Sequence, residues 1–274
     1  MQNYEEVRRV AAYISGQLPG SFRPELALAC GTGLDELADI FRSVRRIPFA
    51  DIPGFPRATV ASHAGCFSAA YFGEKPVLLQ EGRCHLYEGY TPAQVCMGVR
   101  VAHDLGARSL VIANAAGCLN PQWDAGSLML ITDHINCTGT SPLTGANHDP
   151  WGPRFPDMSR IYDREYQGIA LEAAQAADVR LERGVYVGIL GPELESPAQT
   201  RMYRQAGADA IGMSTVLEVI AARHLGMRVL GVSCLSNKNL PDCMEETGLD
   251  EIIATVRAAS GTLIRLLNAL IPRL

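Results

Sequence analysis

The sequence predicts a single α/β domain, spanning residues 1–274, with a central, largely parallel or mixed β-sheet flanked by helices. Short apolar runs typical of buried strands alternate with helical patterns, and this order favours a mostly parallel sheet covered by helices. The chain has 274 residues, of which 47% are hydrophobic and 19% are charged. That composition suits one large domain with a sizeable core.

Buried strands are predicted wherever several apolar residues follow one another between turn-forming residues. The first such run, ELALAC, comes just before a Gly-Thr-Gly turn, and the last, RVLGVSCL, comes just before a polar segment. The predicted strands span 25–30, 75–82, 109–117, 126–135, 184–190, 209–213 and 228–235.

Helical patterns fall between many of these strands, and several carry start and stop signals. Thr91 and Ser196 are good N-caps, and each is followed by a proline, which suits the first helical position. Ser214 or Thr215 can cap a third helix. Glycines that can end helices stand at Gly106, Gly207 and Gly226. The predicted helices span 92–106, 162–177, 197–207, 215–226 and 248–267.

The two remaining long segments lie at the start and in the middle of the chain. Residues 1–18 have the pattern of an amphipathic helix with acidic residues in its first turn, not that of a signal peptide. The segment 136–161 is too rich in Pro, Gly and Asn for regular structure. Loops this long in a compact domain are usually functional or disordered.

Composition narrows the classes of partner and cofactor. A net charge of −5 argues against nucleic-acid binding, and no apolar run approaches the ~20 residues that span a bilayer. A cytoplasmic location is therefore the default expectation. The eight cysteines form no CxxC pair, and no disulfides are expected in a reducing compartment. No metal is expected, because no metal-ligand spacing relates His103, His134, His148 and His224.

A Gly-rich turn follows the first predicted strand. Backbone N–H groups in such a turn bind anions, and Thr32 adds a hydroxyl. The turn is not a Walker loop, because no GK[ST] follows it. It is not the dinucleotide fingerprint either, because Glu36 occupies the third glycine position, which opposes a nucleotide-cofactor oxidoreductase. Taken alone, the segment is better explained as a tight strand-to-helix turn.

The segment GRCHLYEGY at 82–90 is a more specific signal for an anion. If it continues the preceding strand, Arg83, His85 and Tyr87 share one face. Arginine offers a planar fork of donors and histidine a further donor, which suits phosphate, although a solvated edge strand explains the pattern too. Cys84 beside His85 raises a Cys-His nucleophile as an alternative. Adjacent side chains in a strand point to opposite faces, which disfavours it.

Two polar residues beyond later strands suggest recognition of a flat heterocycle. Glu195 lies in GPELES, between a strand and a helix start, where a helix-capping role is the simpler interpretation. Asn237 follows an apolar strand, and the carboxyl ends of such strands are where α/β sheets bind ligands. The run NAAG, at 114–117, lets backbone approach a ligand closely.

Together, CGTGL, GRCHLYEGY, NAAGCLN, GPELES, GMS and SNK resemble the motifs of the trimeric-type purine nucleoside phosphorylases, from about Leu28 to the C-terminal helix. The resemblance implies the nucleoside phosphorylase fold, a homotrimer and a role in purine salvage. It also implies the conversion of a purine nucleoside and phosphate into free purine and ribose 1-phosphate. Inorganic phosphate is then a co-substrate, and no cofactor is expected.

The resemblance assigns roles to individual residues. It implies catalytic roles for Glu195, Asn237 and His85. The implied phosphate-binding residues are Thr32, His63, Arg83, His85, Ala115 and Ser214. The implied nucleoside-binding residues are Tyr87, Phe155, Leu194, Glu195, Met213, Asn237 and Leu249. Among these, Phe155 is expected to reach into the site of a neighbouring subunit.

The charge of Glu195 allows a physical prediction about the base. An ordinary glutamate is ionised at neutral pH, and a carboxylate only accepts hydrogen bonds. It can accept from N1–H of hypoxanthine or guanine but is repelled by the N1 lone pair of adenine. Asn237 can donate to the N7/O6 edge. The expected substrates are therefore inosine and guanosine, with adenosine a poor one.

Three positions depart from the family pattern. Thr32 stands where serine is usual, and Leu194 where phenylalanine usually stacks on the purine. Leu249 stands where the family often has a histidine that contacts the ribose 5′-hydroxyl. This last departure keeps a 5′-methylthioadenosine or 5′-methylthioinosine phosphorylase as an alternative, although such enzymes carry Asp in place of Asn237 and lack Glu195. A purine-binding protein without catalysis is a further alternative, opposed by the intact phosphate-binding set.

Overall fold

The computed structural model describes residues 2–57 and 65–274. His63, one of the predicted phosphate ligands, lies outside the described residues. The chain begins with helix α1 (Gln2–Gln17), as predicted. No helix in the described part of the chain combines the length and the apolar character needed to cross a membrane.

One mixed sheet organises the described residues. Its strands are β1 (Leu26–Cys30), β2 (Arg42–Pro48), β3 (Cys66–Phe72), β4 (Lys75–Glu81), β5 (Ser109–Cys118), β6 (Leu128–Cys137), β7 (Leu181–Ile189), β8 (Ala210–Gly212) and β9 (Arg228–Lys238). Their order is β2-β3-β4-β1-β5-β8-β7-β6-β9, and β5 also pairs with β9. This extra pairing closes β5, β8, β7, β6 and β9 into a ring.

Strand direction explains where ligands can bind. β1 runs parallel to both β4 and β5, and β5 runs parallel to β9. The carboxyl ends of these four strands therefore meet at one edge of the sheet. Antiparallel pairs also occur, β2 with β3 and β6 with β9 among them, so the sheet is mixed. The predicted α/β fold class is confirmed.

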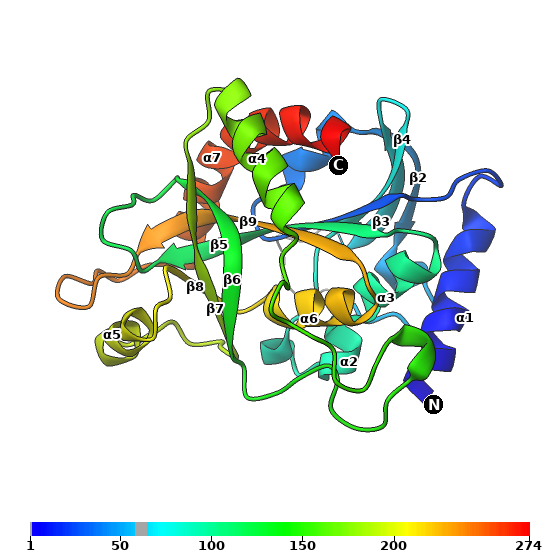
Figure 1. Ribbon diagram of the computed structural model, residues 1–274, viewed down its shortest axis with the longest axis horizontal. Coiled ribbons are helices and arrows are strands. Elements are labelled where there is room, and N and C mark those ends of the chain that lie inside the picture. The colour runs from blue at the N-terminus through cyan, green and yellow to red at the C-terminus, as the bar shows by residue number, and fades with distance from the viewer. Residues whose placement is uncertain (1, 58–64) are drawn as a thin grey trace.

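Helices cover both faces of the sheet (Figure 1). The later helices are α2 (Pro92–Val95), α3 (Met97–Asp104), α4 (Arg164–Ala176), α5 (Pro197–Gln205), α6 (Val216–His224) and α7 (Leu249–Leu270). Helices α1, α3 and α6 pack on one face and share one buried cluster with it. Helices α4 and α7 pack on the other face and share a second cluster.

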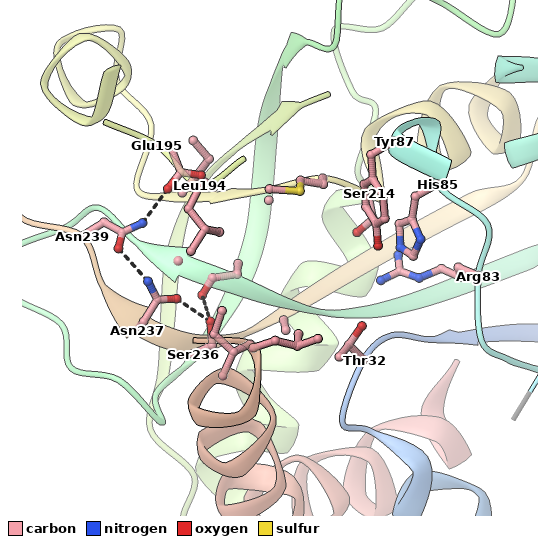
Figure 2. A pocket seen from close by; sticks show the side chains of 18 residues that line it. Thr32, Arg83, His85, Tyr87, Leu194, Glu195, Ser214, Ser236, Asn237 and Asn239 are labelled. Atoms are coloured by element: carbon pink, nitrogen blue, oxygen red, sulfur yellow. Dashed lines mark hydrogen bonds between the residues drawn. The ribbon is translucent and has the colours of Figure 1, made fainter. Parts of the chain in front are cut away.

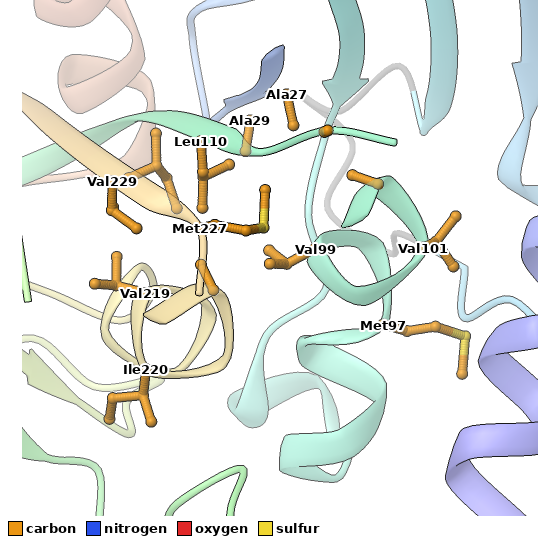
Figure 3. Packing of buried hydrophobic residues seen from close by; sticks show 14 of the residues in the cluster. Ala27, Ala29, Met97, Val99, Val101, Leu110, Val219, Ile220, Met227 and Val229 are labelled. Atoms are coloured by element: carbon orange, nitrogen blue, oxygen red, sulfur yellow. The ribbon is translucent and has the colours of Figure 1, made fainter. Parts of the chain in front are cut away.

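The core between the sheet and α3 and α6 is built from aliphatic side chains (Figure 3). Ala27 and Ala29 of β1 are small, which leaves room for Val99 of α3 and for Met227, the residue before β9. All five residues of β1 are buried, as expected for a central strand with helices on both faces. This packing holds the carboxyl ends of the parallel strands in place.

The predicted helix signals are confirmed. Thr91 accepts a hydrogen bond from Gln94 N (3.3 Å), and Ser196 accepts one from Gln199 N (3.3 Å). Thr215, rather than Ser214, is the N-cap of α6. Helices α3, α5 and α6 are followed by Gly106, Gly207 and Gly226, whose φ angles are 124°, 95° and 76°. A residue with a β-carbon would be strained at these angles.

Three predictions about elements were wrong or incomplete. β2 and β3 were not predicted, because β2 is mostly exposed and rich in arginine, while β3 contains small residues instead of an aliphatic run. The single helix expected over 92–106 is two helices that meet at Cys96. Residues 82–90 do not continue a strand, because β4 ends at Glu81 and a 3₁₀ turn spans Leu86–Glu88.

Candidate active site

A single pocket gathers all but two of the predicted site residues (Figure 2). It lies at the edge where the parallel strands end, and its walls come from segments far apart in the sequence. Eleven predicted residues line it: Thr32, Arg83, His85, Tyr87, Ala115, Leu194, Glu195, Met213, Ser214, Asn237 and Leu249. Seven further residues line it that were not predicted as site residues: Ala116, Gly117, Ile211, Gly212, Ser236, Asn239 and Ile252.

The sheet explains why these segments meet. Thr32 follows β1, and Arg83 follows β4. Ala115 belongs to the end of β5, and Asn237 belongs to the end of β9. Because the four strands are parallel neighbours, their ends converge, as is general for ligand sites in α/β sheets.

Arg83 lies at one of the two polar ends of the pocket. Its side chain is buried, and Nη1 donates to Thr215 Oγ1 (3.1 Å) and Glu218 Oε2 (3.2 Å). Its Nη2 lies against Gly31, where an added β-carbon would be only 2.5 Å away. In the described residues Nε has no hydrogen-bond partner. The bonds to Thr215 and Glu218 thus fix the guanidinium in position on the pocket wall.

His85 and Tyr87 reach the same end from a loop. His85 Nδ1 lies 2.8 Å from Glu88 Oε1, and the ring stacks on Tyr87 with centroids 4.8 Å apart. Since a carboxylate only accepts, it holds the hydrogen on Nδ1 and fixes the orientation of the ring. Arg83, His85 and Tyr87 therefore share the pocket as predicted, but through a loop and a 3₁₀ turn instead of a strand.

Burial reinforces the protonated state of two neighbouring groups. Desolvation by burial raises the pKa of Tyr87 to about 12, so the phenol keeps its hydrogen as a donor at neutral pH. Burial likewise raises the pKa of Cys84 to about 12, so its thiol stays protonated. Cys84 is also absent from the pocket wall. The structure therefore gives no support to a Cys-His nucleophile.

The Ser214 side of the pocket is a strained turn before α6. Thr215 has φ 73° and ψ −54°, and Val216 N donates to Ser214 O (2.8 Å), which is the geometry of a γ-turn. Thr215 Oγ1 accepts from Asn114 Nδ2 (2.8 Å) as well as from Arg83. These buried bonds hold a backbone conformation that is unfavourable for a β-branched residue. They leave Ser214 on the pocket wall, at the amino-terminal end of α6.

The opposite end of the pocket carries a chain of hydrogen bonds (Figure 2). Glu195 Oε2 accepts from Asn239 Nδ2 (2.8 Å), and Asn239 Oδ1 accepts from Asn237 Nδ2 (2.6 Å). Asn237 Oδ1 in turn accepts from Ser236 Oγ (2.7 Å). Glu195 is 8% exposed, and desolvation by burial raises the pKa of its carboxyl above the ordinary value of 4.5.

A β-bulge brings two consecutive residues of β9 to the pocket. Ala116 pairs with Leu235. The next residue, Gly117, pairs with Asn237, so Ser236 is the extra residue on β9. Neighbours in a regular strand point to opposite faces, but a bulge re-aims them. Sequence reasoning missed Ser236 because a bulge leaves no periodic signal.

Asn239 was missed too, although a signal existed. It lies two residues after Asn237, and residues two apart in an extended segment share a face. Its side chain is only 6% exposed. A β-carbon on Gly117 would lie 2.6 Å from Asn239 Nδ2, so the glycine of the NAAG run makes room for this amide.

Two of the apolar residues that line the pocket are also well exposed. Leu194 is 47% exposed, and Leu249, the first residue of α7, is 57% exposed. Both lie on the pocket wall. Leu249 has Ile252 beside it on the same wall, one turn further along α7.

Phe155 does not line the pocket of its own chain. It is 87% exposed and lies in the irregular segment between β6 and α4. Among the described residues, no group of three or more His, Cys, Asp or Glu side chains could hold a metal ion.

Comparisons with known proteins show the family of the chain. Residues 25–272 match the model of the phosphorylase superfamily. Purine nucleoside phosphorylase 1 of Bacillus subtilis is 41% identical over 267 residues, which cover 97% of this chain and 98% of that protein.

Two solved structures are similar over almost their whole length. Isoform 2 of purine nucleoside phosphorylase from Schistosoma mansoni, in complex with cytosine and ribose-1-phosphate, has a TM-score of 0.93 and 36% identity, covering 99% of this chain and 97% of that one. A schistosoma purine nucleoside phosphorylase in complex with hypoxanthine has a TM-score of 0.91 and 32% identity. The match covers 98% of this chain and 97% of that one.

Proposed function

Because the chain belongs to the phosphorylase superfamily, and within it to the purine nucleoside phosphorylases, we propose that it catalyses the reversible phosphorolysis of 6-oxopurine nucleosides. The substrates are inosine, guanosine and their deoxy forms. An oxygen of phosphate bonds to C1′ as the C1′–N9 bond breaks, which yields free purine and (deoxy)ribose 1-phosphate. Phosphate is a co-substrate, no cofactor takes part, and the reaction serves purine salvage.

We assign phosphate to the end of the pocket that holds Arg83. The groups there are the Arg83 guanidinium, the Ser214 and Thr32 hydroxyls, the backbone at Ala115 and the His85 ring, whose Nε2 donates only when both ring nitrogens carry a hydrogen. His63, outside the described residues, completes the set by resemblance. A fixed guanidinium and several hydroxyl and N–H donors suit a compact anion. Tyr87 and Met213 also line the pocket, and by resemblance they position the ribose.

We assign the purine to the end that holds Glu195, and this buried carboxylate is the observation that carries the substrate class. Its Oε2 is taken by Asn239, which leaves Oε1 to accept from N1–H of a 6-oxopurine. Adenine offers a lone pair at N1 instead. Oε1 of the buried carboxylate then faces a lone pair and receives no hydrogen bond from the base, which costs several kcal/mol.

Asn237 acts during bond cleavage. As the glycosidic bond stretches, negative charge builds on the purine, and an N–H donor at the N7/O6 edge binds that charge more tightly than it binds the ground state. Asn237 has two amide hydrogens, one of which goes to Asn239. The other is available to the base. Phosphate, on the opposite side of the ribose, stabilises the positive charge at C1′ before it attacks.

One observation favours a second candidate, a 5′-methylthioadenosine or 5′-methylthioinosine phosphorylase. Leu249 and Ile252 form an apolar wall that suits a methylthio group better than a 5′-hydroxyl. Glu195 opposes the adenine form of this substrate but not the hypoxanthine form.

We further propose that the enzyme works as a homotrimer in the cytoplasm. The assembly is supported by the resemblance, and Phe155, at 87% exposure, is accessible to a neighbouring subunit. In the assembly Phe155 would reach the nucleoside in a neighbouring site. The location is supported by free, buried thiols such as Cys30, Cys96 and Cys118, which suit a reducing compartment.

The experiment that tests this function is a product assay with and without phosphate. Inosine, guanosine and 5′-methylthioinosine are each incubated with enzyme, and purine and sugar products are separated. We expect hypoxanthine and guanine only when phosphate is present, together with ribose 1-phosphate. Free ribose without phosphate would indicate a hydrolase and overturn the proposal. Preference for methylthioinosine would favour the second candidate.

A further inference from the structure

We infer that Asn239 is a specificity-determining positioning residue that couples recognition of the two edges of the purine. It joins Glu195, which faces the N1 edge, to Asn237, which faces the N7/O6 edge. The inference rests on the proposed function and adds a residue to it. Asn239 was not among the predicted site residues, and it contacts both members of the base-recognition pair.

The polarity of the hydrogen-bond chain follows from the charge of Glu195. An ionised carboxylate only accepts, so Asn239 must present its NH₂ group to Oε2. The carbonyl of Asn239 then faces Asn237, which must present its own NH₂ group in return. Asn237 Oδ1 accepts from Ser236 Oγ at the end of the chain.

This polarity determines what the purine meets at its N7/O6 edge. With the Asn237 carbonyl turned to Ser236 and one N–H turned to Asn239, the group left for the base is the second N–H. A donor matches O6 and N7 of hypoxanthine and guanine. Without Asn239, the Asn237 amide can rotate and present its carbonyl, which matches the 6-amino group of adenine. Asn239 thereby makes Glu195 and Asn237 select the same class of base, the 6-oxopurines.

The surroundings are built to hold Asn239 in place. The side chain is 6% exposed, and its backbone N donates to Cys118 O (2.8 Å). Gly117 leaves the space that the Asn239 amide occupies, since a β-carbon there would lie 2.6 Å from Nδ2. Free rotation of the amide is therefore restricted on the side of β5.

The test compares Asn239→Ala with Asn120→Ala as a matched control. Asn120 makes the same kind of bond, from Nδ2 to Asp209 Oδ1 (2.9 Å), but does not line the pocket. We expect Asn239→Ala to lower kcat/KM for inosine about 10-fold, the size of one lost hydrogen bond, while adenosine changes less than about 3-fold. The KM for phosphate should not change. Asn120→Ala should leave the inosine-to-adenosine ratio unchanged.

A double-mutant cycle separates positioning from a merely structural role. If Asn239 acts partly through Asn237, removing Asn239 in the Asn237→Ala background should lower inosine kcat/KM less than it does in the wild-type background, because only the bond to Glu195 is then lost. Equal losses in both backgrounds would overturn the inference, as would an unchanged inosine-to-adenosine ratio in Asn239→Ala.

Asn239→Asp covers the case in which the alanine variant does not fold. It keeps the shape of the side chain but places a second carboxylate against Glu195, so the loss with inosine should be at least as large. An Asn239→Asp variant that keeps the wild-type ratio of inosine to adenosine kcat/KM would overturn the inference. If the wild-type enzyme itself does not cleave inosine with phosphate, the proposed function fails, which is a different result.

Discussion

At the scale of single residues, the base-recognition end combines a group that sequence reasoning found with groups it did not. Glu195 and Asn237 stood out because a polar residue beyond an apolar strand indicates a ligand site. Asn239 and Ser236 did not, because their roles depend on which atoms they meet. Sequence identifies the type of side chain, but the partner of an amide is set by the three-dimensional register of the strand.

The raised pKa of Glu195 predicts how activity depends on pH. The ionised carboxylate is the form that accepts N1–H, so inosine kcat/KM falls as pH drops through this pKa. Because burial raises the pKa, the fall begins at a higher pH than an ordinary glutamate with pKa 4.5 would give. The measurement is a pH profile of kcat/KM for inosine.

Glu195→Gln serves as the control for that profile. It should lose this acidic limb, whereas any change caused by ionisation of phosphate itself should remain. An acidic limb of the same shape in Glu195→Gln would show that another group is responsible.

At the scale of elements, the parts of the fold that could be predicted are those with a periodic pattern. Buried strands such as β1 and amphipathic helices such as α7 carry that pattern throughout. Strand β2 does not, because it is an exposed edge strand with three arginines. The segment after β4 has alternating polar residues, a pattern that fits a loop as well as the predicted strand. Its residues converge on the pocket through a 3₁₀ turn that no short-range pattern indicates.

The turn after β1 makes a prediction about phosphate binding. In Gly31→Ala, the new β-carbon would lie 2.5 Å from Arg83 Nη2 and displace the guanidinium. The phosphate KM should rise about 10-fold or more, the size of one charge-assisted hydrogen bond, while the KM for inosine changes little. Steady-state kinetics with each substrate varied in turn measures both.

Gly168→Ala is the control for Gly31→Ala, since nothing lies within 4 Å of its added β-carbon. Its kinetics should match the wild type. An unchanged phosphate KM in a folded Gly31→Ala variant would remove this role from the turn.

At the scale of the whole molecule, a single chain supplies both ends of the pocket but not Phe155. The sequence suggested a shared site only through resemblance, because nothing in one chain specifies what covers an exposed aromatic ring. A trimer with Phe155 in the neighbouring site predicts complementation between defective subunits. Coexpression of Phe155→Ala with Glu195→Gln should restore sites in which both residues are intact.

A second pair of variants is the matched control for complementation. Arg83→Ala and Glu195→Gln alter the same pocket of one chain, so every site in the mixture retains a defect. Their coexpression should not restore activity. Equal recovery in both mixtures, or no recovery in the first, would contradict a site shared between subunits.

In the proposed function, the buried carboxylate of Glu195 selects 6-oxopurine nucleosides for phosphorolysis. The most direct measurement is kcat/KM for inosine and adenosine, at saturating phosphate, in the wild type and in Glu195→Gln. We expect the wild type to prefer inosine by about 100-fold, corresponding to about 3 kcal/mol, and Glu195→Gln to lose most of that preference. Adenosine turnover equal to that of inosine in the wild type, or an unchanged preference in Glu195→Gln, would contradict the account.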